Sequence, residues 1–383
     1  MGANTFGTHF QITTFGESHG LAMGVVVEGC PAGVPFSQTL LKEKMERRRP
    51  GYFPWTSSRK EPDEPELLSG VFEERTLGTP LALIVKNKNF RSKDYQNIKN
   101  QARPGHADDV WKEKFGFTDY RGGGRASGRE TTGRVLGGAV AEMFLKTLYK
   151  SLTVTAFPVQ IGPFIRTSDS INAPPASTYI PIEIENFGFK SLANKGPRSY
   201  KKVIPSGYKK KWFGSQTKEV EDFLIQKKSE GLSYGGTIRL EIGKPPAGLG
   251  QPVFRKLKSD MASAFLSIGA CYEVSLGDVP FSSEQDKKSK FSSININEIE
   301  GSQLHNKSKD AVYGGIRGGI STGEKIIFQL KFKPPASVLD IAKKGRHDPC
   351  IVPRAVVVVE AMAWLVMADH ILWSRQDRLS DSV

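Results

Sequence analysis

Residues 353–372 read PRAVVVVEAMAWLVMADHIL, and the rest of the chain can be arranged around this stretch. A proline in the first turn suits the start of a helix. The residues that follow are apolar nearly all round, so we expect a long helix buried between layers. Its most apolar part, 355–366, carries Glu360 and is shorter than the roughly 20 residues that a membrane-spanning helix needs. The stretch therefore predicts the core helix of a soluble protein, not a membrane protein.

Further helices and strands supply partners for this core helix. Apolar spacing predicts helices at 38–48, 131–148, 220–231 and 257–268. Ser37 is placed to cap the first of them. Runs rich in β-branched residues predict strands at 10–15, 24–28, 81–85, 152–157, 236–242 and 326–332. Long buried helices combined with strands indicate a layered α+β fold.

The predicted helix at 131–148 contains Gly133, Gly137 and Gly138. Each glycine weakens a helix by roughly 1 kcal/mol relative to alanine. We therefore expect another backbone to approach this helix closely.

No linker divides the 383 residues, so we expect a single domain over residues 1–383, with loop-like excursions at about 161–214 and 281–310. A composition of 38% hydrophobic and 25% charged residues is typical of a soluble globular protein. The chain starts without a secretory signal, and its three cysteines form no CxxC motif. We expect a cytoplasmic protein with neither a disulfide framework nor a metal site.

The net charge of +14 indicates affinity for anions. Part of it lies in the Lys-rich stretch 191–230, which favours a solvated surface. A nucleic-acid-binding protein is the alternative class, and it requires aromatic side chains interleaved with basic ones. Only residues 208–213 show that pattern, with Tyr208, Trp212 and Phe213 around three lysines. This alternative leaves the motifs described next unexplained, so we rank it lower.

Four segments concentrate glycine, arginine and histidine: FGESHG at 15–20, RRRPG at 47–51, RPGHAD at 103–108 with RGGGRASGRE at 121–130, and GGIRGG at 314–319 with GRHDPC at 345–350. Gly-rich backbone and arginine forks bind anions, and histidine and aspartate transfer protons. Taken singly, the segments can also be an ordinary loop histidine, a solvated helix end or a polar turn before the core helix. No Walker A or GxGxxG motif is present. Together the segments predict a pocket for a small, multiply anionic ligand.

The same segments resemble those of the chorismate synthase family, and the likeness runs from about residue 4 to residue 372. It implies an α+β layered sandwich, with long helices between antiparallel sheets, and a homotetramer without nucleic-acid or membrane partners. It also implies an anti-1,4-elimination that converts 5-enolpyruvylshikimate 3-phosphate to chorismate and phosphate. The family requires reduced FMN, although the reaction has no net redox change. Some members reduce the flavin with NADPH, but we expect an external flavin reductase here because no nicotinamide-binding domain is recognisable.

The resemblance also implies roles for individual residues. His19 would protonate the departing phosphate, and His106 would lie near flavin N1 and protonate the reduced ring. Asp348, with flavin N5, would take the proton from ring carbon C6. The substrate-binding set is Arg48, Arg49, Arg59, Arg103 and Arg129. The flavin-binding set is Arg125, Ala126, Ser127, Gly269, Ala270, Gly318, Lys333, Pro334, Pro335, Ala336, Ser337 and Arg346.

Three positions depart from the family pattern. Gly269 stands where asparagine is usual, which removes an amide contact to the flavin. Pro54 stands where a basic residue is frequent, so Arg59 is the substitute. Ala126 replaces a serine and removes one hydroxyl. These departures leave open a second alternative, a family member that has lost activity, although His19, His106 and Asp348 are all present.

Overall fold

The computed structural model describes residues 2–53, 55–56, 61–88, 105–119, 121–166, 212–277, 314–336 and 348–379. Its first sheet is antiparallel, with strands in the order β1-β2-β3-β7-β4. The strands are β1 (Thr5–Phe6), β2 (Gln11–Phe15), β3 (Ala22–Glu28), β7 (Leu81–Lys86) and β4 (Pro65–Ser69). Val25 and Val27 are fully buried, whereas Val26 between them is partly exposed. Because side chains alternate along a strand, one face of this sheet covers the core.

The second sheet is also antiparallel and has the order β11-β14-β10-β8-β9. Its strands are β8 (Thr153–Ile161), β9 (Phe164–Ile165), β10 (Gly236–Gly243), β11 (Cys271–Leu276) and β14 (Ile326–Phe332). Leu240 is fully buried, while Arg239 and Glu241 beside it form an ion pair on the opposite face. Two small hairpins complete the strands, β5 (Val71–Phe72) with β6 (Arg75–Thr76) and β12 (Ile316–Arg317) with β13 (Ile320–Ser321).

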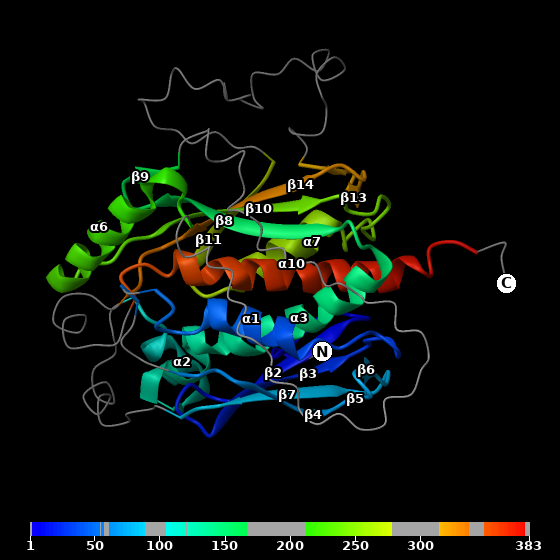
Figure 1. The fold of residues 1–383 in the computed structure, drawn as a ribbon, viewed down its shortest axis with the longest axis horizontal. Helices are drawn as coiled ribbons and strands as arrows, with labels where there is room; N and C mark the ends of the chain where they lie inside the picture. The colour runs from blue at the N-terminus through cyan, green and yellow to red at the C-terminus, as the bar shows by residue number, and fades with distance from the viewer. Residues whose placement is uncertain are drawn as a thin grey trace, which may run out of the picture.

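The helices position the two sheets. They are α1 (Gln38–Arg48), α2 (Asp108–Phe115), α3 (Thr131–Leu148), α6 (Thr217–Glu230), α7 (Leu257–Leu266) and α10 (Val352–Ser374), with short 3₁₀ turns η2 (Arg121–Ala126), η3 (Gly128–Glu130) and η4 (Gly214–Gln216). Figure 1 shows α10 running between the sheets, with α1 and α3 on the side of the first sheet. On its other side α10 packs against α7, β8 and β10. Mixed helices and antiparallel sheets confirm the α+β class.

The expected elements are present, and Ser37 caps α1 by accepting a hydrogen bond from the Leu40 N–H at 3.2 Å. Helix α2 and the two-residue strands were not predicted, and neither were the longer strands β4 and β11. β4 is an edge strand that begins with a proline, and β11 is a mixed polar edge strand, so neither has a strong apolar pattern. Residues 161–166 of the first expected excursion form the end of β8 and β9. Most of that excursion, and all of 281–310, lies outside the described residues.

The glycines of α3 mark close backbone contacts, as expected. A Cβ placed on Gly138 would lie 2.5 Å from the Cα of Ala361 in α10. A Cβ on Gly133 would lie 2.8 Å from the carbonyl oxygen of Gly24 in β3. Because real Cβ contacts are longer, α3 can lie this close to both α10 and the first sheet only with glycine at these positions.

The core helix α10 is long and apolar enough to cross a membrane by length and composition, but 94% of its most apolar 18-residue window is buried inside the structure. The second sheet and the helices α1, α3 and α7 cover it. Its position is that of a core helix, as the sequence predicts.

Glu360, the one acidic residue in the middle of α10, has basic and backbone partners from two other elements. Its carboxylate accepts hydrogen bonds from both terminal nitrogens of Arg47 at 2.8 and 3.0 Å, and from the Ala156 N–H at 3.1 Å. The Lys44 ammonium lies 3.8 Å away. Burial alone would raise the pKa of Glu360, but the charges of Arg47 and Lys44 lower it below its ordinary value. This carboxylate therefore joins α10 to α1 and to β8.

Replacing Glu360 with glutamine is expected to lower the free energy of unfolding by about 3–5 kcal/mol, because the buried guanidinium of Arg47 would lose the carboxylate that pairs with both of its terminal nitrogens. Glu241→Gln is the matched control, since its ion pairs lie on the outer face of the second sheet and are worth about 1 kcal/mol or less. Urea unfolding of both variants measures the difference. Equal losses would contradict a central role for Glu360.

Candidate active site

Two buried arginines share one buried carboxylate where α1 ends. Arg48 Nη1 donates to Asp63 Oδ2 at 3.0 Å, and Arg129 Nη1 donates to Asp63 Oδ1 at 2.9 Å. All three side chains are less than 5% exposed. The possibility that Arg47 and Arg48 form a solvated helix end is therefore wrong. Successive residues on a helix point about 100° apart, so Arg47 turns to Glu360 while Arg48 turns to Asp63.

The charges in this cluster are strongly coupled. Burial would raise the pKa of Asp63, but the charges of Arg48 and Arg129 hold it below its ordinary value. Burial, together with repulsion by Arg354 and Arg129, lowers the pKa of Arg48 to about 9 despite the attraction of Asp63. Arg48 thus remains charged near neutral pH. Asp63 pairs with Arg48 and Arg129, and Asp348 pairs with Arg354, so three arginines meet two aspartates and the cluster has spare positive charge.

Arg48 and Arg129 differ in how their nitrogens are used. Arg48 donates through Nε to the Thr131 hydroxyl at 3.1 Å, and through Nη2 to the Gly128 carbonyl at 3.0 Å. Arg129 donates through Nε to Asn87 Oδ1 at 2.6 Å, but its Nη2 is buried with no hydrogen-bond partner among the described residues. Of the two, Arg129 has the guanidinium better able to bind an added anion.

The loop that carries His19 is tied to the same cluster through Asn87. The side-chain amide of Asn87 donates to the carbonyls of Glu17 and Gly20 at 3.1 and 2.8 Å. These two hydrogen bonds fix the loop before and after His19, whose side chain is only 4% exposed. Gly16 begins the turn at φ +89°, and a Cβ there would lie 2.1 Å from the Ala22 carbonyl oxygen, so only glycine fits.

An acidic residue faces His19. Burial would raise the pKa of Asp119, but hydrogen bonds and charge from Arg121, together with His19, lower it. Ser18 also donates to the Arg121 carbonyl at 3.3 Å. The loop at 16–20 is therefore in contact with Arg121 and close to Asp119.

Asp348 lies at the start of the core helix, where it is 7% exposed and forms an ion pair with Arg354 in the first turn. Arg354 also donates through Nε to the Arg48 carbonyl at 3.1 Å. Lys228 of α6 donates to the Thr56 carbonyl and is close enough to Asp348 for their charges to interact. Burial lowers the pKa of Lys228, and the charge of Asp348 opposes that shift. A continuous set of contacts thus connects Asp348, Arg48, Asp63, Arg129, Asn87 and the His19 loop.

His106 lies among several of the residues in the predicted flavin-binding set. It pairs with Asp108 at 2.8 Å at the start of α2. The neighbouring Gly105 carbonyl accepts a hydrogen bond from Lys333 Nζ at 3.2 Å, and the Lys333 N–H donates to the Ala270 carbonyl at 2.9 Å. A Cβ on Gly105 would lie 3.8 Å from that of Ala336. Segments 105–106, 270 and 333–336 therefore meet at one place.

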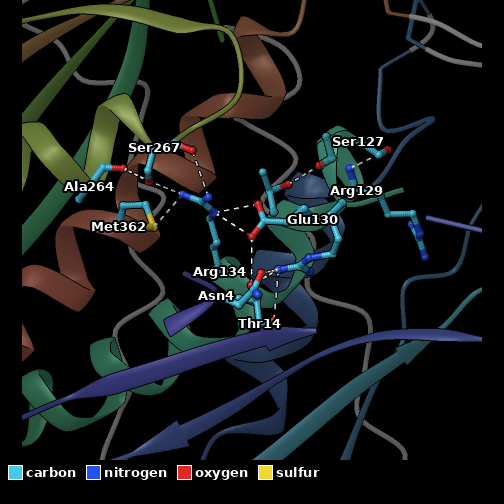
Figure 2. Close-up of polar contacts among 12 residues, drawn as sticks. Asn4, Thr14, Ser127, Arg129, Glu130, Arg134, Ala264, Ser267 and Met362 are labelled. Carbon is cyan, nitrogen blue, oxygen red and sulfur yellow. Dashed lines mark hydrogen bonds and ion pairs between the residues drawn. The ribbon is translucent and has the colours of Figure 1, made fainter. Parts of the chain in front are cut away.

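Arg125 is anchored beneath the Gly-rich turn. Its guanidinium donates to the Thr14 hydroxyl at 2.7 Å, to the Gly16 carbonyl at 3.3 Å and to Asn4 at 3.1 Å (Figure 2 labels Asn4 and Thr14). Ser127 accepts a hydrogen bond from the Arg129 N–H at 3.3 Å. Ala126, between Arg125 and Ser127, is partly exposed. The turn that carries these residues thus leads directly to Arg129.

Gly318 is not brought to the other flavin-set residues. It lies in the β12–β13 hairpin, where the adjacent Gly319 carbonyl accepts the Leu257 N–H at the start of α7. Ala270 follows the end of α7, and Lys333 follows the far end of β14. The seven residues of β14 span about 20 Å. Gly318 is therefore at the opposite end of these elements.

Other expected residues vary in their outcome. Arg49 caps α1 and pairs with Glu46 at 3.1 Å, Gly269 is exposed, and Pro334 and Pro335 follow Lys333 in the same segment. Four expected residues lie outside the described part of the chain: Arg59, Arg103, Ser337 and Arg346. Sequence reasoning missed four residues of the cluster: Asp63, Asn87, Lys228 and Arg354. Each stands alone among ordinary residues, so only its place in three dimensions gives a signal.

The aromatic pattern that suggested nucleic-acid binding has another cause. Trp212 and Phe213 are fully buried, and Trp212 packs on Phe53 and Trp55. Their rings therefore pack in the interior and offer no surface for stacking bases.

Comparisons with known proteins agree with one another. A family model described as chorismate synthase matches residues 10–372. A chorismate synthase of Bdellovibrio bacteriovorus is 49% identical over 384 residues, covering 99% of this chain and 100% of the relative. One of Lachnospira eligens is 39% identical and covers 100% and 99%. A chorismate synthase crystal structure superposes with a TM-score of 0.66 at 25% identity, covering 96% of this chain and 93% of that one.

Asp63→Asn is expected to destabilise the protein most at neutral pH, by about 3–5 kcal/mol, because it leaves Arg48 and Arg129 buried without their counter-charge. The pKa of Asp63 is lower in the folded than in the unfolded state. Its contribution is therefore complete above the unfolded pKa, near pH 4, and is lost as the pH falls through the folded pKa. Urea unfolding of both proteins from pH 7 to pH 3 should show the gap narrowing only at the acidic end. A gap that is constant with pH would contradict this assignment.

Proposed function

This chain belongs to the chorismate synthase family and is a lyase that converts 5-enolpyruvylshikimate 3-phosphate to chorismate, and we propose that its reaction requires reduced FMN. The observation that carries the site assignment is the continuous set of contacts from the His19 loop through Arg129 and Arg48 to Asp348. It brings proton-transfer groups and spare cationic charge to one place.

The cluster suits a substrate with two carboxylates and a phosphate. We propose Arg129 as a direct ligand, because its buried Nη2 lacks a partner among the described residues. Arg48 uses each of its nitrogens within the protein. Its role in substrate binding is to hold Asp63 and the turn at Gly128 in place. The roles of Arg49, Arg59 and Arg103 stay predictions.

The residues around Gly105 fit a flavin. Gly105, Ala270 and Ala336 have small side chains, and Lys333 adds one ammonium group beside them. Such a set leaves room for a flat ring and supplies a cation for a charged tail. When bound, reduced FMN would lend an electron that helps to expel phosphate and would then recover it. The Gly105 cluster and the Arg125–Ser127 turn are the parts of the chain that we propose hold it.

The proton-transfer residues then have separate tasks. His19 holds a proton for the departing phosphate, in the loop that Asn87 closes. Asp348 accepts the proton that leaves C6, and its ion pair with Arg354 holds its carboxylate at the start of α10. His106 lies beside the Gly105 cluster with Asp108 on its Nδ1. It is our candidate for protonating the reduced flavin ring.

We propose four further properties. The chain forms one layered-sandwich domain, because its buried apolar side chains make one continuous core. It assembles as a homotetramer, for which the partly exposed Val26, Ala82 and Ile84 on the outer face of the first sheet supply apolar contact surface. It is cytoplasmic, in keeping with three free thiols. An external reductase, or NADPH acting directly, supplies reduced flavin.

The first test is phosphate release from 5-enolpyruvylshikimate 3-phosphate under anaerobic conditions. We expect release with dithionite-reduced FMN and none with oxidised FMN or with dithionite alone. Release without flavin would overturn the cofactor proposal. No release from the folded protein under any condition would favour the inactive family member.

His19→Asn tests the proton donor, because asparagine keeps hydrogen bonding but cannot transfer a proton. We expect kcat to fall about 10²- to 10⁴-fold. Wild-type activity should decline as the pH rises and histidine loses its proton, and that limb should be missing in the variant. A variant with the wild-type pH profile would remove His19 from proton transfer.

A further inference from the structure

A line of polar side chains connects the Gly-rich turn to the end of α7. Arg125 donates to the Thr14 hydroxyl, which donates to Glu130 Oε1 at 3.2 Å. Glu130 in turn pairs with Arg134 through Nε at 2.9 Å. Arg134 reaches across to Ser267, as Figure 2 shows. The line therefore crosses from β2 over the start of α3 to the C-terminal cap of α7.

Arg134 is the centre of this line. Nη1 donates to the Ser267 hydroxyl at 2.6 Å, and Nη2 donates to the Ser267 carbonyl at 3.1 Å. The Met362 sulfur lies 3.8 Å from Nη1. The Arg134 and Glu130 side chains are 16% and 14% exposed, so their ion pair is largely shielded from water, whereas the bonds to Ser267 lie at the exposed end of the line. A guanidinium can serve a carboxylate on one side and a hydroxyl with a carbonyl on the other, because its donors form a rigid planar fork.

Ser267 begins the turn that leads to the Gly105 cluster. Gly269 and Ala270 follow it, and Ala270 has φ +69°, a left-handed conformation that alanine rarely adopts. The Ala270 carbonyl then accepts the Lys333 N–H. The position of this strained turn, and of Lys333 beyond it, thus depends on how Ser267 is held.

We propose that Arg134 is a positioning residue for the flavin, and this rests on the proposed function. Through Glu130 it fixes the Arg125–Ser127 turn, and through Ser267 it fixes Ala270 and Lys333. The two parts of the proposed flavin site come from segments more than 130 residues apart in sequence. Arg134 sets the spacing between them without contacting the flavin.

The experiment measures binding of oxidised FMN to the purified full-length protein by quenching of flavin fluorescence. Arg134→Gln is expected to weaken binding about 10- to 100-fold, because it loses the bonds to Glu130 and to the Ser267 carbonyl together. Arg134→Lys keeps the charge but cannot serve both sides, so it should recover only part of the affinity. Ser267→Ala keeps the carbonyl bond and should weaken binding a few-fold.

Arg239→Gln is the matched control. Arg239 pairs with Glu241 at 2.8 Å and is 12% exposed, but it lies on the outer face of the second sheet. FMN affinity should not change in that variant. A role confined to stability would lower the melting temperature without changing FMN affinity in the folded protein. A positioning role raises the FMN concentration for half-maximal activity while leaving the KM for substrate at saturating FMN unchanged.

The outcomes separate the two proposals. Wild-type protein that binds no FMN would overturn the cofactor assignment and this inference with it. Wild-type binding together with unchanged affinity in Arg134→Gln would overturn the inference alone. If Arg134→Gln does not fold, Ser267→Ala decides, since unchanged affinity there also overturns it. A double variant of Arg134→Gln and Ser267→Ala that is no weaker than Arg134→Gln alone would support it, because the two residues then act as one unit.

Discussion

The paired carboxylate of Glu360 is the constraint on which the rest of the structure depends. A charged group in the middle of a core helix has to be neutralised by partners, or it costs several kcal/mol. Its partners come from the last turns of α1 and from β8, so the pairing fixes the rotation of α10 and brings α1 against it. Arg48, the next residue after Arg47, is then turned toward Asp63. The pairing of the core thus determines where the charges of the candidate site lie.

The site is held together by residues that have no part in proton transfer. Asp63 collects two arginines, and Asn87 joins one of them to the His19 loop. Arg354 joins the start of α10 to the end of α1. Apart from the Arg48–Asp63 pair, these links connect segments that are 42 to 306 residues apart in sequence. The arrangement is therefore preorganised by the fold and does not depend on a single flexible loop.

Much of this could be predicted from the sequence, for identifiable reasons. The core helix, α3 and the central strands have strong periodic or β-branched patterns, whereas the edge strands β4 and β11 do not. His19, Arg129 and Asp348 are recognisable because they lie in Gly- and Arg-rich motifs. Asp63 and Asn87 carry no such signal, since their importance comes from packing. Gly318 lies in such a motif, yet the motif does not say where in space the residue lies. Only the fold shows that it is near the start of β14, whereas Lys333 follows its end.

Gly138 affects the site only through the position of α3. It has no functional group and packs against Ala361, about one helical turn beyond Arg134 in α3. Any side chain there would push α3 away from α10. Because a helix is stiff, the displacement would also shift Glu130 and Arg134 at the N-terminal end of α3. The substitutions that Gly138 tolerates are therefore limited by the geometry of residues that it does not itself contact. A genetic screen for loss of activity would single out this glycine beside the histidines, although it takes part in no chemistry.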